Sequence, residues 1–66
     1  MKNTLKIERA KVGLTQADLA EKVSVSRQTI VAIEGGKYVP STVLALKIAQ
    51  VFGQSVEAVF QLESGD

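Results

Sequence analysis

The sequence contains no cysteine and no histidine, and these two absences exclude several kinds of protein. Without cysteine, a chain has no disulfides, no thiolate metal ligands and no cysteine nucleophile. Without histidine, it lacks a frequent zinc ligand and the base of a Ser-His-Asp triad. No other acid–base constellation stands out in the 66 residues. We therefore expect a protein that is not an enzyme and that binds no metal and no cofactor.

Long apolar runs are missing as well. No stretch approaches the roughly 20 apolar residues of a membrane-spanning helix. The first residues, MKNTLKIERAK, also lack the apolar core of a secretory signal. These absences predict a cytoplasmic protein without a membrane partner. The composition, 45% hydrophobic and 23% charged, is typical of a folded globular domain.

The length limits both the number of domains and their stability. Sixty-six residues make one domain, which we expect to span 1–66. A chain of this size buries only about 60% of its unfolded surface. With disulfides and metals excluded, helix packing and self-association remain as sources of additional stability.

The basic residues are concentrated in one part of the chain. All eight Lys and Arg residues lie within 1–47 together with four acidic residues, whereas 48–66 contains three acidic residues and no basic one. The first part therefore carries +4 and the second −3, which sums to the net charge of +1. This segregation suits a polyanion partner, and ordinary solvated surface charge explains it about equally well.

Glycines and capping residues divide the chain into five predicted helices, at 5–12, 16–23, 27–34, 42–52 and 56–62. Thr15, with Asp18 three residues later, is a relative of the capping box. Gly13 and Gly53 follow helices as C-terminal stops. Serine occupies the N-cap of the last three helices, at Ser26, Ser41 and Ser55. No segment requires a strand, so the expected fold class is all-α, a compact five-helix bundle. Residues 63–66 should fray.

The second and third predicted helices are joined by only about three residues, which favours a steep crossing known as a helix-turn-helix. We expect this motif at about 16–35. Ala20 should let the third helix approach closely, while Val25 fills the turn and Ile30 faces inward. The predicted core comprises Leu5, Leu14, Leu19, Ala20, Val23, Val25, Ile30, Ile33, Ala45, Ile48, Ala49, Phe52, Val56, Val59 and Phe60.

The outward face of the third helix follows from its inward one. With 100° per residue and with Ile30 and Ile33 inside, Gln28 and Ala32 point outward. Arg27 and Val31 flank them, and Thr29 lies at one edge. Arginine and glutamine read guanine and adenine edges, and small apolar side chains contact the thymine methyl group. An exposed helix start also needs polar residues, so both interpretations stay open on this evidence alone.

The run GLTQADLAEKVSVSRQTIVAIEGGKYVPSTVLALKIAQVFG carries a resemblance to a known family. It resembles the Cro/cI-type (Xre-like) helix-turn-helix domains of small regulators. The segments LTQADLA, VSRQTI and GKYVPS occur in order and at family spacing, and the similarity covers residues 5 to about 62. The resemblance implies a lambda-repressor-like DNA-binding domain of five helices. Such domains are usually dimeric, and their third helix enters the major groove.

The resemblance also implies roles for single residues. Base-reading positions correspond to Arg27, Gln28, Thr29 and Ala32. Positions that contact DNA phosphates correspond to Gln16, Ser26, Lys37 and Tyr38. The remaining correspondence is structural, because Arg9 and Glu34 match a pair that commonly forms a partly buried salt bridge between the first and third helices.

Three residues depart from the family pattern. Ser24 occupies a turn position that is most often glycine and usually demands a left-handed backbone. Gly35 stands where Asn or Thr is frequent, which predicts a more flexible loop. Glu8 stands where leucine is common, so we expect Ile7 to fill that part of the first helix's face.

The helix predicted at 42–52 is apolar almost all the way round. Only Thr42, Lys47 and Gln50 are polar, which is too few for a helix with one wet face. A tiny domain normally exposes some apolar surface, but we favour a homodimer interface here. Two recognition helices would then lie about 34 Å apart and read a pseudo-palindromic operator. The candidate interface residues are Val43, Leu46, Gln50, Val56, Val59 and Leu62.

We therefore expect a sequence-specific regulator of transcription, a repressor, that binds double-stranded DNA as a homodimer. No small-molecule ligand is evident. Two alternatives stay open. One is an antitoxin-like DNA-binding protein whose C-terminal segment also binds a toxin. The other is a protein-interaction module that keeps the fold without reading DNA.

Overall fold

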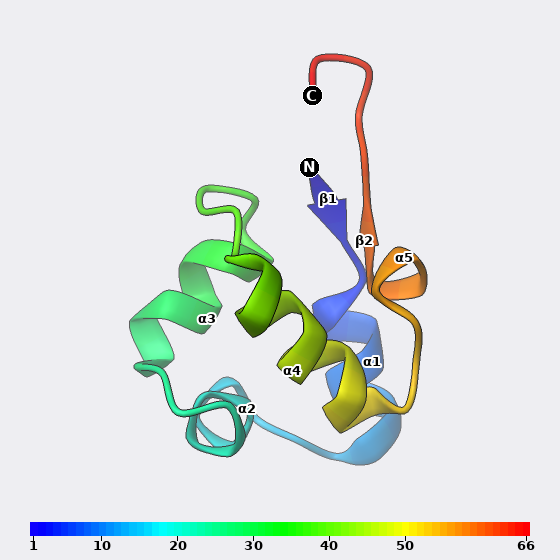
Figure 1. Cartoon of the computed structure of the whole chain (residues 1–66). Coiled ribbons are helices and arrows are strands. Elements are labelled where there is room, and N and C mark those ends of the chain that lie inside the picture. The colour runs from blue at the N-terminus through cyan, green and yellow to red at the C-terminus, as the bar shows by residue number, and fades with distance from the viewer.

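The structure is a computed structural model that describes all 66 residues. Helices form most of it. The five helices are α1 (Leu5–Val12), α2 (Gln16–Lys22), α3 (Arg27–Glu34), α4 (Thr42–Phe52) and α5 (Val56–Val59) (Figure 1). Two strands, β1 (Lys2–Asn3) and β2 (Phe60–Gln61), pair near the chain ends. The expected helical fold class is confirmed, and the first four helices end within one residue of the predicted bounds.

Side-chain caps explain why the helices begin where they do. Thr15 and Asp18 form a full capping box before α2, because each side chain accepts a 3.0 Å hydrogen bond from the other residue's backbone N–H. The serines before α3, α4 and α5 each accept a hydrogen bond from the backbone N–H three residues later. These caps satisfy donors that the first helical turn leaves free.

The predicted fifth helix, 56–62, is wrong in its second half. Its backbone becomes extended at Phe60, and β2 pairs antiparallel with β1, with Lys2 opposite Gln61 and Asn3 opposite Phe60. The N–H of Thr4 donates to the carbonyl of Val59 at 2.9 Å, and the side chain of Phe60 is buried. The expectation that no segment forms a strand is therefore corrected.

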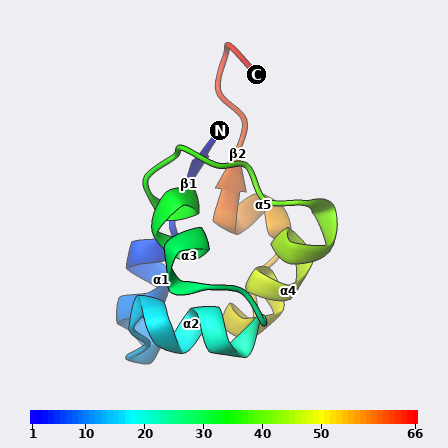
Figure 2. The ribbon, with the colours of Figure 1, turned by 90° about the vertical axis from the view of Figure 1, so that its left-hand side faces the viewer.

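α4 packs against α1, α2 and α5, and α3 packs against α2 (Figures 1 and 2). Most of the predicted core residues are buried. Leu14, Val25 and Val56 differ, because they are partly exposed and pack against the edge of the core. Leu44 is a further core residue that the prediction omitted. The buried core consists of Leu5, Leu19, Ala20, Val23, Ile30, Ile33, Leu44, Ala45, Ile48, Ala49, Phe52, Val59 and Phe60.

The expectation for Ile7 is also wrong. Ile7 is 59% exposed, whereas Glu8 is buried at 9% exposure. Residues three apart share a helix face, so Glu8 lies beside the buried Leu5, and Ile7 points away from it. The Glu8 carboxylate accepts a 3.2 Å hydrogen bond from the ammonium of Lys11 at the protein surface.

The two chain ends meet beside the small sheet (Figure 1). The N-terminal ammonium lies 3.0 Å from Asp66 and 3.2 Å from Glu63, and its hydrogen bonds to these carboxylates raise its pKa above 8.0. A backbone N–H of Glu63 donates to Asp66 at 2.8 Å and lowers the pKa of that carboxyl group. Residues 63–66 thus form a turn, and their fraying stays a prediction.

Candidate nucleic-acid interface

A tight turn connects α2 to α3. The N–H of Val25 donates to the carbonyl of Ala20 at 3.0 Å, and Ala20 is buried against α3. Ser24 has φ of +61° and is the one non-glycine residue with positive φ, so the left-handed backbone expected at this position is present. Val25 is half-buried over the core. The turn therefore ends α2 and starts α3 within a few residues, and the two helices form a helix-turn-helix.

The core fixes which face of α3 points outward. Ile30 and Ile33 are 0% and 1% exposed, so they hold this side of the helix against the core. Arg27, Gln28 and Val31 are exposed on the opposite side, while Thr29 and Ala32 are half-buried at its edges. Figure 2 views the molecule with α2 and α3 at the front. Of the four predicted base-reading residues, Arg27 and Gln28 are therefore exposed, and Thr29 and Ala32 lie at the edges of the exposed side.

One hydrogen bond links the beginnings of α2 and α3. The guanidinium of Arg27 donates to the side-chain carbonyl of Gln16 at 3.5 Å. The amide NH2 of Gln16 is left available to an outside acceptor. The hydroxyl of Ser26 accepts from the N–H of Thr29 at 3.2 Å, and the two hydroxyls share a 3.0 Å hydrogen bond. The structure therefore brings together a predicted phosphate ligand and a predicted base-reading residue.

Lys37 and Tyr38 lie on the loop that follows α3. The N–H of Lys37 donates to the carbonyl of Ala32 at 2.9 Å, which ties the start of this loop to the recognition helix. Gly36 has φ of +74°, a conformation that suits glycine and lets the chain reverse here. Both side chains are exposed. Tyr38 lines one groove together with Thr29, so the loop adjoins one edge of α3.

The far end of α3 is anchored by an ion pair. The guanidinium of Arg9 donates two hydrogen bonds to the carboxylate of Glu34, at 2.9 and 2.7 Å, and a third to the carbonyl of Leu14 at 3.0 Å. The two side chains are only 15% and 12% exposed. The hydrogen bond to Glu34 raises the pKa of Arg9. This pair, which the family resemblance implies, joins α3 to α1. The bond to Leu14 adds the loop that follows α1.

A second anchor comes from the N-terminal segment. The side-chain amide of Asn3 donates to the carbonyl of Ile33 at 2.8 Å, and its oxygen accepts from the N–H of Leu5 at 3.1 Å. Sequence reasoning missed this contact, because nothing near Asn3 in the chain indicates a distant carbonyl. The end of α3 is therefore fixed to two other segments, while its first turn projects toward solvent.

Cations that are free to meet an anion remain near α3. The four ion pairs of the structure use the N-terminal ammonium, Arg9 and Lys11. Arg27 and Lys37 form no ion pair. The acidic tail lies with the chain ends, away from the turn between α2 and α3 (Figure 1). No group of three or more Asp, Glu, His or Cys side chains is arranged to hold a metal ion.

The predicted dimer residues do not all reach the surface. Val43, Leu46, Gln50 and Leu62 are exposed, Leu62 at 79%, and Val56 is half-buried. Val59, the last residue of α5, is 0% exposed and belongs to the core, as the predicted core list also had it. Val59 therefore cannot form part of an interface, and this member of the predicted set is corrected.

A tight turn between two packed helices, an outward polar helix start and free cations beside it define a helix-turn-helix DNA-binding domain. The profile of the family described as helix-turn-helix matches residues 5–59. The chain belongs to this family, the Cro/cI-like (Xre) transcriptional regulators, whose members bind DNA and are not enzymes. None of its helices is long and apolar enough to cross a membrane.

Similar proteins span the same length and carry the same description. An uncharacterised HTH-type transcriptional regulator of Methanocaldococcus jannaschii is 58% identical over 66 residues, which is 100% of both chains. The HTH-type transcriptional regulator YgzD of Bacillus subtilis is 54% identical over 63 residues and covers 96% of each chain.

Solved structures share the fold. The clp gene regulator ClgR of Corynebacterium glutamicum aligns with a TM-score of 0.73 at 33% identity. That alignment covers 79% of this chain and 55% of ClgR, so the chain spans about half of that protein. A transcriptional regulator from Listeria innocua aligns with a TM-score of 0.72 over 100% of this chain and 68% of its own, at 19% identity, which speaks for the fold alone.

Proposed function

We propose that this regulator is a repressor that binds a pseudo-palindromic DNA operator as a homodimer, with α3 in the major groove. The observation that carries the proposal is the division of α3 into a buried side, at Ile30 and Ile33, and an exposed side that begins with Arg27 and Gln28. The buried side of α3 and its anchored C-terminal end hold the helix in place. The exposed first turn of α3 is then available to contact base edges. Because the ligand is chromosomal DNA, the proposed compartment is the cytoplasm.

The exposed side chains of α3 match the chemistry of base edges. The forked guanidinium of Arg27 suits the two acceptors of guanine, and the amide of Gln28 suits the acceptor and donor of adenine. Ala32, with Val31 beside it, offers apolar contact for a thymine methyl group. Thr29 lies at the edge of this surface, where its hydroxyl already bonds to Ser26. Each well-formed base contact discriminates by about 1–3 kcal/mol.

Residues around this surface suit the DNA backbone. Gln16, whose amide NH2 is free, and Ser26 flank the start of α3. Lys37 and Tyr38 follow its end on a loop that bonds directly to α3. Contacts of this kind fix register and supply salt-dependent affinity, whereas base contacts supply sequence choice. The proposed complex therefore holds the duplex on both sides of the recognition helix.

The dimer is proposed on the exposed apolar side of α4. A groove of about 210 Å³ lies there, with a lining that is mostly apolar and includes Leu46, Val56 and Phe60. Val43 and Leu62 are exposed at well over half of their surface. Covering this area with a second copy would remove apolar surface from water, and it would add to the small core. A two-fold dimer presents two α3 helices to half-sites about one helical turn apart.

Selection of binding sites from random duplex DNA tests the proposal. We expect the protein to enrich a palindromic consensus, and we expect Gln28→Ala to relax one symmetry-related pair of positions. Gln54→Ala, which changes an exposed glutamine after α4, is the matched control and should return the original consensus. If no sequence is enriched, the protein does not read DNA by sequence, and a protein-interaction role becomes the better account.

A further inference from the structure

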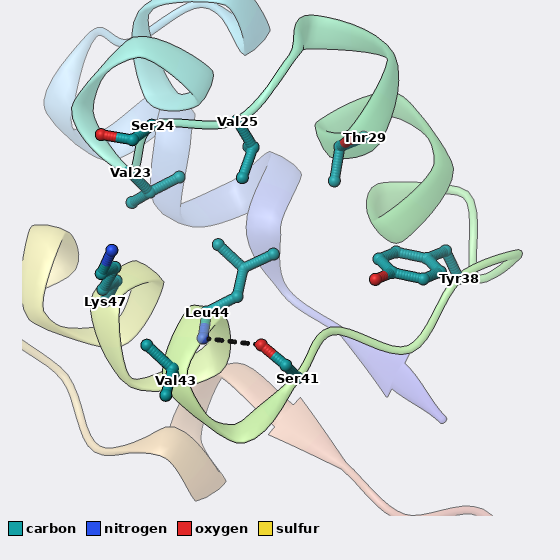
Figure 3. A pocket seen from close by; sticks show the side chains of 9 residues that line it. All are labelled: Val23, Ser24, Val25, Thr29, Tyr38, Ser41, Val43, Leu44 and Lys47. Carbon is teal, nitrogen blue, oxygen red and sulfur yellow. Dashed lines mark hydrogen bonds between the residues drawn. The ribbon is translucent and has the colours of Figure 1, made fainter.

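A groove of about 350 Å³ runs between the turn before α3, the loop after it and α4 (Figure 3). Its floor is apolar and includes Val25 and Leu44. Ser24 and Lys47 lie at one end of it and Tyr38 at the other, with the hydroxyl of Tyr38 pointing inward (Figure 3). The proposed function leaves Ser24 and Lys47 without a role.

Three polar groups of this groove have no partner within the protein. Ser41 accepts from the N–H of Leu44 at 3.2 Å (Figure 3), and Thr29 is bonded to Ser26. The hydroxyls of Ser24 and Tyr38 and the ammonium of Lys47, by contrast, have no hydrogen-bond partner and form no ion pair. All three groups can donate. No acidic residue lines the groove, so these donors favour an anion.

The identity of two of these residues is unusual for their positions. Ser24 holds a left-handed backbone with φ of +61°, where glycine would avoid the steric cost of a β-carbon. Such strain is found most often where a side chain has a function. Lys47 is the one charged residue in α4, an otherwise largely apolar helix. Neither residue contributes a polar contact to the fold that would account for it.

The groove is continuous with the surface proposed to bind DNA. Thr29 and Tyr38 line it and also belong to that surface. An anion held there while α3 occupies the major groove would be part of the sugar-phosphate backbone that borders this groove in the duplex. We propose that Lys47, with the hydroxyl of Ser24 at the same end of the groove, binds a phosphodiester of the operator backbone. This inference rests on the proposed function.

The role assigned to Lys47 is to position the duplex. Its contact adds affinity to every sequence and fixes the angle at which α3 meets the bases. Lys47 also follows Leu46 on the exposed side of α4, beside the surface proposed for the dimer. A substitution at Lys47 therefore has to be examined for its effect on dimerisation as well as on DNA binding.

The test measures the affinity of Lys47→Met for the selected duplex and for a scrambled duplex as a function of salt. The substitution keeps most of the apolar stem and removes the charge. We expect affinity for both duplexes to fall by about 5- to 20-fold. The slope of log K against log salt should become shallower by about 0.9 for each subunit. Lys6→Met, which removes an exposed and unpaired lysine of α1, is the matched control and should leave both quantities unchanged.

Two further measurements separate the explanations. Sedimentation equilibrium should give Lys47→Met the same dimerisation constant as the unchanged protein. Inorganic phosphate, added at constant ionic strength, should produce no saturable shift in the NMR signals of Lys47 and Ser24. A saturable shift would mean a site for a free anion and would overturn the assignment to DNA.

The proposal is also overturned if Lys47→Met keeps the original salt slope, or if weaker dimerisation accounts for its whole loss of affinity. If the unchanged protein selects a palindrome and Lys47→Met has the same affinity and salt slope as the unchanged protein, only this inference fails. If the unchanged protein enriches no sequence, the proposed function fails as well.

Discussion

Replacing Ser24 by glycine should make the protein more stable. Ser24 has φ of +61°, and a left-handed backbone costs a residue with a β-carbon about 1–2 kcal/mol. Glycine avoids this cost, but it loses about 0.5–1 kcal/mol more conformational entropy on folding. The side chain of Ser24 is exposed and forms no hydrogen bond within the protein, so its removal breaks no contact. The difference between these two terms spans about 0–1.5 kcal/mol, so the expected net gain in the free energy of unfolding is its midpoint, about 0.75 kcal/mol.

Thermal unfolding followed by circular dichroism measures this gain. In a domain of this size, 1 kcal/mol corresponds to about 4–8 °C in Tm, so Ser24→Gly should raise Tm by about 3–6 °C. Ser24→Ala is the control, because it removes the hydroxyl and keeps the β-carbon. Its Tm should stay close to that of the unchanged protein. A Tm of Ser24→Gly that is unchanged or lower would show that the turn stores no such strain.

The two substitutions should act alike on DNA binding and differently on stability. If the hydroxyl of Ser24 binds a backbone phosphate, then Ser24→Gly and Ser24→Ala both weaken DNA binding to a similar extent, although only the first raises Tm. A glycine variant that is more stable and binds DNA as tightly as the unchanged protein would separate the strain at Ser24 from any role in binding.

Three other substitutions test the anchor of α3, the first cap and the dimer. Glu34→Gln should cost about 2 kcal/mol in urea unfolding, because it leaves the guanidinium of Arg9 partly buried without a counter-charge; an equal cost in an Arg9→Met background would contradict the pairing. The N–H of Thr15 and its hydroxyl lower the pKa of Asp18 below 3.8. The free energy of unfolding should thus be higher with Asp18 than with Asp18→Asn above about pH 4, and this difference should disappear as the pH falls through the lowered pKa. If the two proteins still differ by the same amount at about pH 2, the carboxylate of Asp18 is not the cause. Leu46→Lys should shift sedimentation equilibrium toward the monomer with little change in secondary structure, and an unaltered dimer would exclude this side of α4 from the interface.

Helix bounds were largely predictable because local chemistry sets them. Each cap depends on a side chain within three residues of the backbone group that it satisfies, so the sequence around Thr15 or Ser26 contains the needed information. The strand pair was not predictable in the same way. Two residues are too few to show a period, and β2 exists because Asn3 and Thr4 meet Phe60 and Val59 across the whole chain.

The candidate site was predictable only in part. The outward face of α3 follows from helical geometry once Ile30 and Ile33 are known to be inside. The contact between Arg27 and Gln16, the anchor at Asn3 and the groove beside Lys47 each join segments that are far apart in sequence. Such contacts depend on the angles at which the helices pack, and no local pattern encodes them.

Mapping the DNA-contact surface by NMR shows directly whether α3 meets the DNA. The labelled protein would be titrated with its selected duplex while the backbone amide signals are followed. The account predicts that the largest shifts occur at residues 26–29, at Gln16 and in the loop at Lys37 and Tyr38, with small shifts in β1 and β2. Large shifts confined to β1, β2 and α5, with the first turn of α3 unaffected, would contradict the claim that α3 reads the DNA.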